Sequence, residues 1–388
     1  MKSSKFILPV IVISQFLCTS LWFAGNGVMP DLMDTFGLQE RDLGHLTSLV
    51  QFGFISGTLM FAVLSVADRF SPSKVFFGCA LLGAAFNLGV IWEGNSLGSI
   101  LVFRFFTGFF LAGIYPVGMK IAADYFEKGL GKSLGFLVGA LVVGTAFPHL
   151  LKGLTESISW IFVLISTSSL AVLGGFLMLS LVPDGPFRKP SQHIRLSAFF
   201  KVFQERNFRA AAFGYFGHMW ELYAFWAFVP SMILAFGSKE TISWDISTLS
   251  FLVIGIGGIA CVLGGFLSQR FGAKQVAFVS LLLSGLCCLI SPWIFSQPSA
   301  GLFLAFLLFW GMVVIADSPL FSTLVAQNAP AELKGTALTI VNCIGFAITI
   351  ISIQLLNAIS PLIEPNLLYL VLAAGPILGL LALQNKQA

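Results

Sequence analysis

Apolar runs long enough to cross a lipid bilayer recur along the whole chain. A helix needs about 20 apolar residues to span ~30 Å of hydrocarbon. Only 10% of the 388 residues are charged and 57% are hydrophobic, whereas a soluble globular domain is about 25% charged. The sequence therefore predicts an all-α polytopic membrane protein. Twelve transmembrane helices are expected, at 6–29, 45–66, 75–93, 98–123, 133–153, 159–182, 210–236, 246–268, 275–295, 300–325, 336–358 and 367–384.

Basic residues are distributed unequally between the two sides of this topology. The side that holds the N-terminus carries most lysines and arginines, and the other side has only Arg41, Lys152 and Lys239. Cytoplasmic loops of membrane proteins are enriched in lysine and arginine. We therefore expect an integral plasma membrane protein (the inner membrane of a bacterium) with both termini in the cytoplasm. The net charge of +4 reflects this topology, and no nucleic-acid partner is expected.

One polar segment, residues 183–207, divides the twelve runs into two groups of six. Its first part contains Pro183, Pro186 and Pro190, which disfavour a helix. Its second part, 196–206, is basic and amphipathic, which is typical of a helix lying on a membrane surface. We predict an N-terminal six-helix bundle at 1–182, a cytoplasmic linker with an interfacial helix at 183–207, and a C-terminal six-helix bundle at 208–388.

The two halves repeat each other at a nearly constant offset. Arg69 and Arg270 follow the second run of each half and are 201 residues apart, and each is followed by a phenylalanine. The Gly108/Gly311 pair and the corresponding pair of prolines, 116 and 319, are each 203 residues apart. Landmarks in the same order at one offset indicate a duplication, as in transporters built from internal repeats.

Loops near the landmarks carry recognisable motifs. The loop after the second run contains Ala67-Asp68-Arg69 and then Lys74. It resembles the G-x-L-A-D-R-x-G-R-K motif of the major facilitator superfamily, although Leu64 and Ser71 replace the glycines. A second copy follows the eighth run, with glutamine replacing the acid; it keeps Gly265, Leu267, Arg270, Gly272 and Lys274.

Further motifs extend this resemblance over essentially the whole chain. Residues 101–108, with Arg104 and Gly108, are similar to the family's R-x-x-x-G motif, and the turns at Gly131 and at 330–335 are similar to P-x-x-x-R-G. The resemblance implies two pseudo-symmetric six-helix bundles that rock around a midplane site, without a cofactor. It also implies cytoplasmic charges that latch the inner gate: Asp68, Arg69, Lys74, Asp124, Arg270 and Lys274.

A few titratable residues lie inside the predicted spans. They are Arg104, His149, His218, Glu221 and Asp317. A charge at mid-membrane costs about 2.5–3.5 kcal/mol on insertion scales, so each is a functional candidate. The resemblance implies that spans one, four, seven and ten line a central cavity, and this places all but His149 on cavity spans.

The two acids are the main candidates for proton binding. His218 and Glu221 are three residues apart and share a helix face, and burial favours the neutral form of a carboxyl group. Such a group can load and release a proton, although the pair could instead fasten two helices together. Asp317 stands two residues before Pro319, which tends to kink a helix. It is predicted to bind a ligand or a proton, or to pair with His218.

The other candidates point to substrate contact. Arg104 can hold an anion through its planar fork of donors, and a structural or proton-coupling role is equally open. Asn26 is flanked by glycines in the first span, and the alternative for it is a helix–helix hydrogen bond. Trp22, Tyr223 and Trp226 lie on cavity spans.

These residues predict a secondary active transporter and no enzyme, because neither a P-loop nor a nucleophile–base pair is visible. We expect a monomer in the lipid bilayer that couples protons to uptake of a small polar organic solute, which is anionic if Arg104 binds it. The main alternative is proton-driven efflux of a cationic or amphipathic compound. Minor alternatives are a transporter-like sensor and metal-ion transport, for which His218, Glu221 and Asp317 would be the ligands; no resident metal is predicted.

Overall fold

The computed structural model describes residues 6–39, 41–126, 130–154, 158–188, 199–330 and 333–384. No strand occurs within these ranges, and helices make up most of them. The chain divides into two compact units at residues 193 and 194. The interfacial helix predicted at 196–206 lies partly outside the described residues, and its described part contains only α11, Phe199–Val202.

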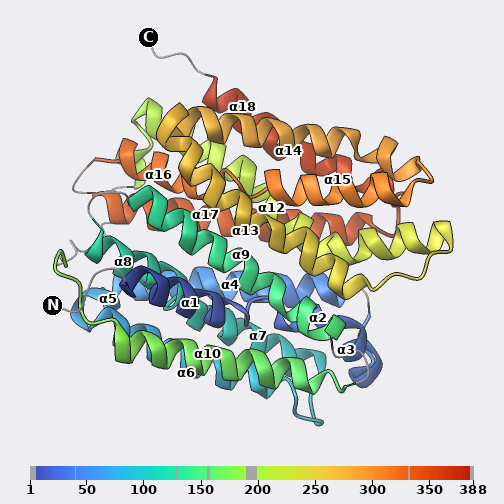
Figure 1. Cartoon of the computed structure of the whole chain (residues 1–388), viewed down its shortest axis with the longest axis horizontal. Helices are drawn as coiled ribbons and strands as arrows, with labels where there is room; N and C mark the ends of the chain where they lie inside the picture. The colour runs from blue at the N-terminus through green and yellow to red at the C-terminus, as the bar shows by residue number, and fades with distance from the viewer. Residues whose placement is uncertain are drawn as a thin grey trace. The chain divides into compact units, whose positions relative to one another are not determined.

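Unit 1 contains the first ten helices (Figure 1). The first predicted span is broken into three pieces, because the chain leaves the helical path at 20–23 and again at Val28. Helices α6 and α10 run side by side in the figure and pack extensively on each other. The helices are α1 Ile7–Thr19, α2 Ala24–Gly27, α3 Met29–Phe36, α4 Asp42–Val63, α5 Val66–Arg69, α6 Pro72–Gly89, α7 Leu97–Leu111, α8 Tyr115–Tyr125, α9 Leu130–Leu154 and α10 Ile161–Leu181.

Unit 2 is built in a similar way, but its first long helix, α12, is continuous through Pro230. This helix packs mainly on α17 and α18. The elements after α11 are α12 Arg206–Glu240, α13 Ile246–Phe271, α14 Ala273–Ser296, α15 Ala300–Val313, α16 Ser318–Asn328, α17 Lys334–Ile359, the 3₁₀ helix η4 Leu368–Ala373 and α18 Ala374–Leu383.

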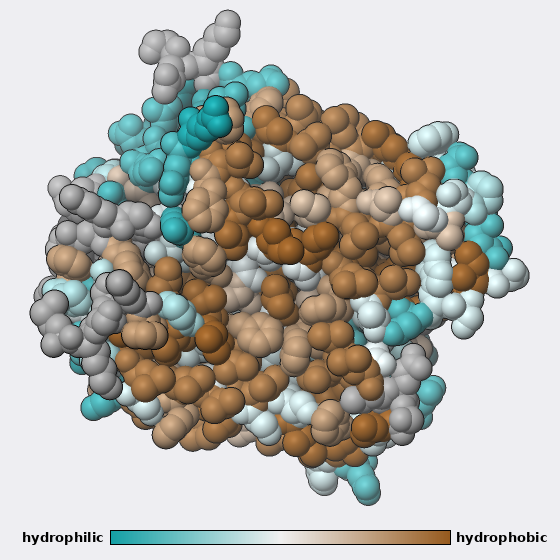
Figure 2. All heavy atoms as spheres, in the orientation of Figure 1, coloured by the Kyte–Doolittle hydropathy of each residue, from teal (hydrophilic) through white to brown (hydrophobic). Residues whose placement is uncertain are grey.

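The membrane character of the chain is visible in both composition and surface. Among the described residues, nine helical segments are long and apolar enough to span a bilayer, counting α7–α8 and α15–α16 as one segment each. The first and last predicted spans appear as the shorter apolar helices 7–19 and 368–383. Figure 2 shows hydrophobic side chains over the middle of the helices and hydrophilic ones toward their ends. Exposed apolar residues such as Phe176 and Trp293 suit contact with lipid.

The duplication is reproduced in the packing of each unit. A Cβ added at Gly108 would lie 2.0 Å from the carbonyl oxygen of Val50, and one at Gly311 would lie 2.0 Å from that of Val253. Both pairs therefore bring the second and fourth spans of their half into backbone contact, with the same offset of 203 residues. The fourth span of each half then breaks, and a proline stands in the first turn of the helix that follows, α8 or α16.

Candidate functional site

Three of the predicted residues form a buried polar cluster in unit 2. His218 and Glu221 lie one turn apart on α12, and Asp317 lies at the break between α15 and α16. His218 Nδ1 is 2.8 Å from Asp317 Oδ1, and each side chain is only 1% exposed. The break exists because Pro319 cannot donate a backbone hydrogen bond. It places the Asp317 side chain beside an intact neighbouring helix.

Glu221 is fully buried and joins three helices. Ser284 Oγ on α14 donates to Oε2 at 2.6 Å, and Trp310 Nε1 on α15 donates to Oε1 at 2.6 Å. Both partners are neutral groups. Within the described part of unit 2, no lysine or arginine forms an ion pair with Glu221 or Asp317.

Some polar atoms of the cluster form no hydrogen bond. Among the described residues, His218 Nε2 and Asp317 Oδ2 have no hydrogen-bond partner. Buried groups of this kind are costly unless they are paired, so they are places where a proton, water or solute can bind. The metal alternative gains no geometric support, since no three His, Cys, Asp or Glu side chains among the described residues are arranged to hold an ion.

Arg104 is fully buried in unit 1. Its guanidinium group lies at the break in the first span. Its terminal nitrogens donate to the carbonyl oxygens of Leu21 and Trp22 and to Asn87 Oδ1, which lies 3.1 Å from Nη1. The carbonyls are available because residues 20–23 leave the helical path. In this structure the terminal guanidinium nitrogens therefore bind protein groups, and contact with an anion would require some of these bonds to open.

The remaining substrate candidates also contact their own unit. Asn26 Nδ2 donates to Thr47 Oγ1 on α4 at 2.8 Å, which is the helix–helix bond considered as its alternative role. The Tyr223 and Trp226 rings lie 5.2 Å apart edge to face. His149 on α9 is 3% exposed, and its Nε2 has no hydrogen-bond partner among the described residues.

The charged loop of unit 1 forms a network that includes two residues not predicted for it. Lys120 Nζ on α8 lies 2.9 Å from Asp68 Oδ1 and 3.9 Å from Asp124 Oδ1. Arg188 donates to the backbone oxygens of Asp68 and Phe70 at 2.9 and 2.8 Å. The network therefore ties α5, α8 and the segment after α10 together.

The other predicted gating residues lie on the surface. Arg69, Lys74, Arg270 and Lys274 are all exposed. The Arg270 guanidinium stands over the Phe271 ring at 5.3 Å, a contact worth about 0.5–1 kcal/mol at an exposed site.

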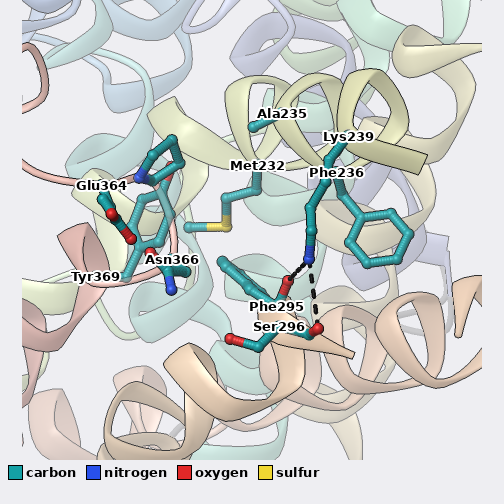
Figure 3. Close-up of a pocket in the computed structure, with 10 residues that line it drawn as sticks. Met232, Ala235, Phe236, Lys239, Phe295, Ser296, Glu364, Asn366 and Tyr369 are labelled. Atoms are coloured by element: carbon teal, nitrogen blue, oxygen red, sulfur yellow. Dashed lines mark hydrogen bonds between the residues drawn. The ribbon is translucent and has the colours of Figure 1, made fainter. Parts of the chain in front are cut away.

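A separate pocket of about 340 Å³ lies in unit 2, between the ends of α12 and α14 and the start of η4 (Figure 3). Lys239 points into it, and its amine donates to the carbonyl oxygens of Phe295 and Ser296 at 3.2 and 3.4 Å. These carbonyls end α14, so the lysine caps that helix. None of the pocket residues belongs to the cluster of His218 and Asp317.

A family model of the Major Facilitator Superfamily matches residues 11–353. The chain belongs to this superfamily. The family and the solved structures that resemble the chain are transporters and not enzymes, and the fold is that of an integral membrane protein.

Curated members of the superfamily match parts of the chain. The efflux pump FUB11 of Gibberella moniliformis is 28% identical over 155 residues, which are 39% of this chain and 26% of the pump. The niacin transporter NiaP of Acinetobacter baylyi is 30% identical over 168 residues, 35% of this chain and 36% of NiaP. The benzoate transport protein of the same organism is 23% identical over 318 residues, 69% of this chain and 65% of that protein. The chain thus spans about a quarter of the length of the efflux pump it matches.

Solved superfamily structures match nearly the whole fold. The proton:xylose symporter XylE superposes with a TM-score of 0.76 at 15% identity, covering 98% of this chain and 95% of XylE. The human organic anion transporter MFSD10 has a TM-score of 0.74 at 14% identity, covering 99% of this chain and all of the other. At these identities the likeness shows the superfamily fold alone.

Several residues that matter in this superfamily member escaped the sequence analysis. Ser284 and Trp310 hold Glu221, and Lys120 holds Asp68. Two glutamines, Gln15 and Gln51, are fully buried, and neither amide atom of either one has a hydrogen-bond partner among the described residues. Gln15 and Gln51 could have been singled out in the sequence, because each places an amide inside an apolar run.

Proposed function

We propose that this protein is a secondary active transporter that couples proton movement to uptake of a small polar organic solute by alternating access. The superfamily fold supports the transport mechanism, in which two six-helix halves, 1–182 and 208–388, alternate around a midplane site. The excess of lysine and arginine on one side of the predicted topology supports cytoplasmic termini. The transporter is proposed to act as a monomer.

One observation carries the proton coupling: the cluster in unit 2 contains two buried carboxyl groups and one imidazole. If His218 carries a proton, it balances the charge of Asp317 at 2.8 Å. Glu221 then has only neutral donors around it. A buried charge without a counter-ion is expensive, so the closed cluster is most stable when Glu221 also holds a proton. Exposure to water on the other side of the membrane removes that cost and lets the proton leave.

The solute class is suggested by the relatives. Proteins named for niacin and benzoate transport match this chain, and both solutes are small aromatic acids. We propose a solute of that size and polarity. A second direction of transport, efflux of a cationic or amphipathic compound, is supported by the match to an efflux pump.

Flux measurements on the purified full chain in liposomes test this function. Labelled benzoate and nicotinamide would be followed with the outside one pH unit more acidic than the inside, and with the gradient reversed. Protein-free liposomes correct for the permeation of neutral benzoic acid. Uptake against a concentration gradient only with the acidic outside supports proton-coupled uptake. Accumulation only with an acidic interior supports efflux, and pH-independent flux would contradict coupling.

A further inference from the structure

Helix α4 uses one of its faces to approach α7 closely. A Cβ added at Gly53 or Gly57 would collide with backbone carbonyl oxygens of α7, and Val50 contacts Gly108 in the same way. Residues 50, 53 and 57 therefore form one continuous stripe on α4. Gln51 follows Val50 directly, and one residue turns an α-helix by about 100°. The Gln51 side chain therefore lies outside this stripe.

The neighbouring face of α4 is directed at the broken part of the first span. Thr47 Oγ1 accepts the Asn26 amide at 2.8 Å, and the Phe54 ring lies 4.9 Å from the Trp22 ring. Gln51 is four residues after Thr47 and three before Phe54, so it shares this face and lies between the two contacts. Gln51 therefore faces the same segment of the first span that holds Asn26 and Trp22.

Gln51 is fully buried, and neither of its amide atoms has a partner among the described residues. Asn26 Oδ1, on the segment of the first span that this face of α4 contacts, also has no hydrogen-bond partner among the described residues. Buried amides are normally satisfied, and leaving one unsatisfied is destabilising. An unpaired donor and acceptor set beside an aromatic pair matches what a ligand site provides: polar groups that orient a solute and rings that pack on it.

A second buried amide in the same unit shows the opposite arrangement. Asn87 Nδ2 donates to Ser168 Oγ at 3.0 Å and lies 3.3 Å from Thr167 Oγ1, while Asn87 Oδ1 accepts from Arg104. Asn87 is therefore a structural amide, and it provides a matched control for Gln51.

We propose that Gln51 is a specificity-determining residue, whose amide, together with the Asn26 oxygen and the Trp22–Phe54 pair, binds the hydrogen-bonding group of a small aromatic solute. The assignment rests on the proposed transport function, and all of its residues lie within unit 1. The aromatic pair packs against the ring of the solute. The Gln51 amide presents both a donor and an acceptor, so it can bind a carboxylate, a carboxamide or a hydroxyl group. Trp22, Gln51 and Phe54 are each at most 1% exposed, so the site is closed in this structure and opens during the transport cycle.

The test compares Gln51→Leu and the nearly isosteric Gln51→Met with Asn87→Leu. Thermal unfolding of the purified full chain without solute is measured first. Binding of benzoate and nicotinamide at a single pH follows. We expect both Gln51 variants to unfold at the same temperature as the original protein or higher, because they remove unpaired polar atoms. Asn87→Leu is expected to unfold at a lower temperature, because it strips partners from several buried groups.

In the binding measurement, losing the amide should weaken either probe about tenfold, the effect of one hydrogen bond. A lower unfolding temperature for both Gln51 variants would show a structural amide and overturn the proposal. Unchanged affinity would show that the amide does not touch the solute, and absence of binding to the original protein would refute the solute class. Proton coupling does not enter either readout, because both are made without a pH gradient. A failure of coupling is therefore distinguishable from a failure of this site.

Discussion

Replacing Glu221 by glutamine tests the proton site directly. Glutamine has the same shape as glutamate and can keep a hydrogen bond with each of the two partners. Its oxygen can accept from Trp310, whose N–H only donates, and its NH₂ can donate to the Ser284 hydroxyl, which can turn to accept. We therefore expect the stability of the variant to stay within about 1 kcal/mol of the original.

The expected size of the transport effect follows from the charges in the cluster. Glu221 is proposed as the one group of the cluster that gains and loses the coupled proton. One proton per solute converts each pH unit of gradient into about 1.4 kcal/mol, or tenfold accumulation. A glutamine cannot release this proton, so the accumulation ratio should fall from about ten to about one.

The assay is uptake into liposomes under a one-unit pH gradient with the membrane potential clamped at zero. Exchange of labelled for unlabelled solute is measured in parallel. Glu221→Gln should lose accumulation but retain exchange, because it resembles the protonated carrier. Glu240→Gln, at the partly exposed C-terminal end of the same helix, should behave as the original protein. Tenfold accumulation by Glu221→Gln would refute the reasoning, and loss of exchange as well would indicate a structural role for Glu221.

Further substitutions test the packing and the loop network. Gly108→Ala and Gly311→Ala should each cost about 1–3 kcal/mol, because an added Cβ would lie 2.0 Å from a carbonyl oxygen; thermal unfolding checks this, and an unchanged midpoint would contradict the close contact. Arg104→Leu should lower the free energy of unfolding by about 3–5 kcal/mol or prevent folding, because it removes the donor of buried carbonyl groups. A lower yield of folded protein, with or without solute, would support this. A normal yield with loss of solute binding would favour anion contact. Lys120→Ala should lower stability by only about 0.2–1 kcal/mol, since its pair with Asp68 is partly exposed; a chemical denaturation series checks this, and a larger cost would point to a stronger network.

The sequence alone determined the fold class. Apolar runs and the bias of basic residues are local properties, and hydrocarbon allows helices as the main solution for such runs. The duplication was also readable, because Arg69 and Arg270, and Gly108 and Gly311, recur at nearly the same offset along the chain. Asp317 was recognisable as a site candidate from its neighbour Pro319, since both the cost of a buried acid and the effect of proline act locally.

Only the tertiary structure decided what each buried polar group contacts. A sequence shows that Arg104 is inside a span, but its partners are carbonyls freed by a break 82 residues earlier. It shows that Glu221 is buried, but the donors that hold it come from two other helices. Gln51 was overlooked because a glutamine in an apolar run indicates only a buried polar group, and the fold decides whether its neighbours leave it unpaired. Hydrophobic burial depends on composition and can be summed along the chain, whereas a hydrogen bond depends on distance and direction between residues that only folding brings together.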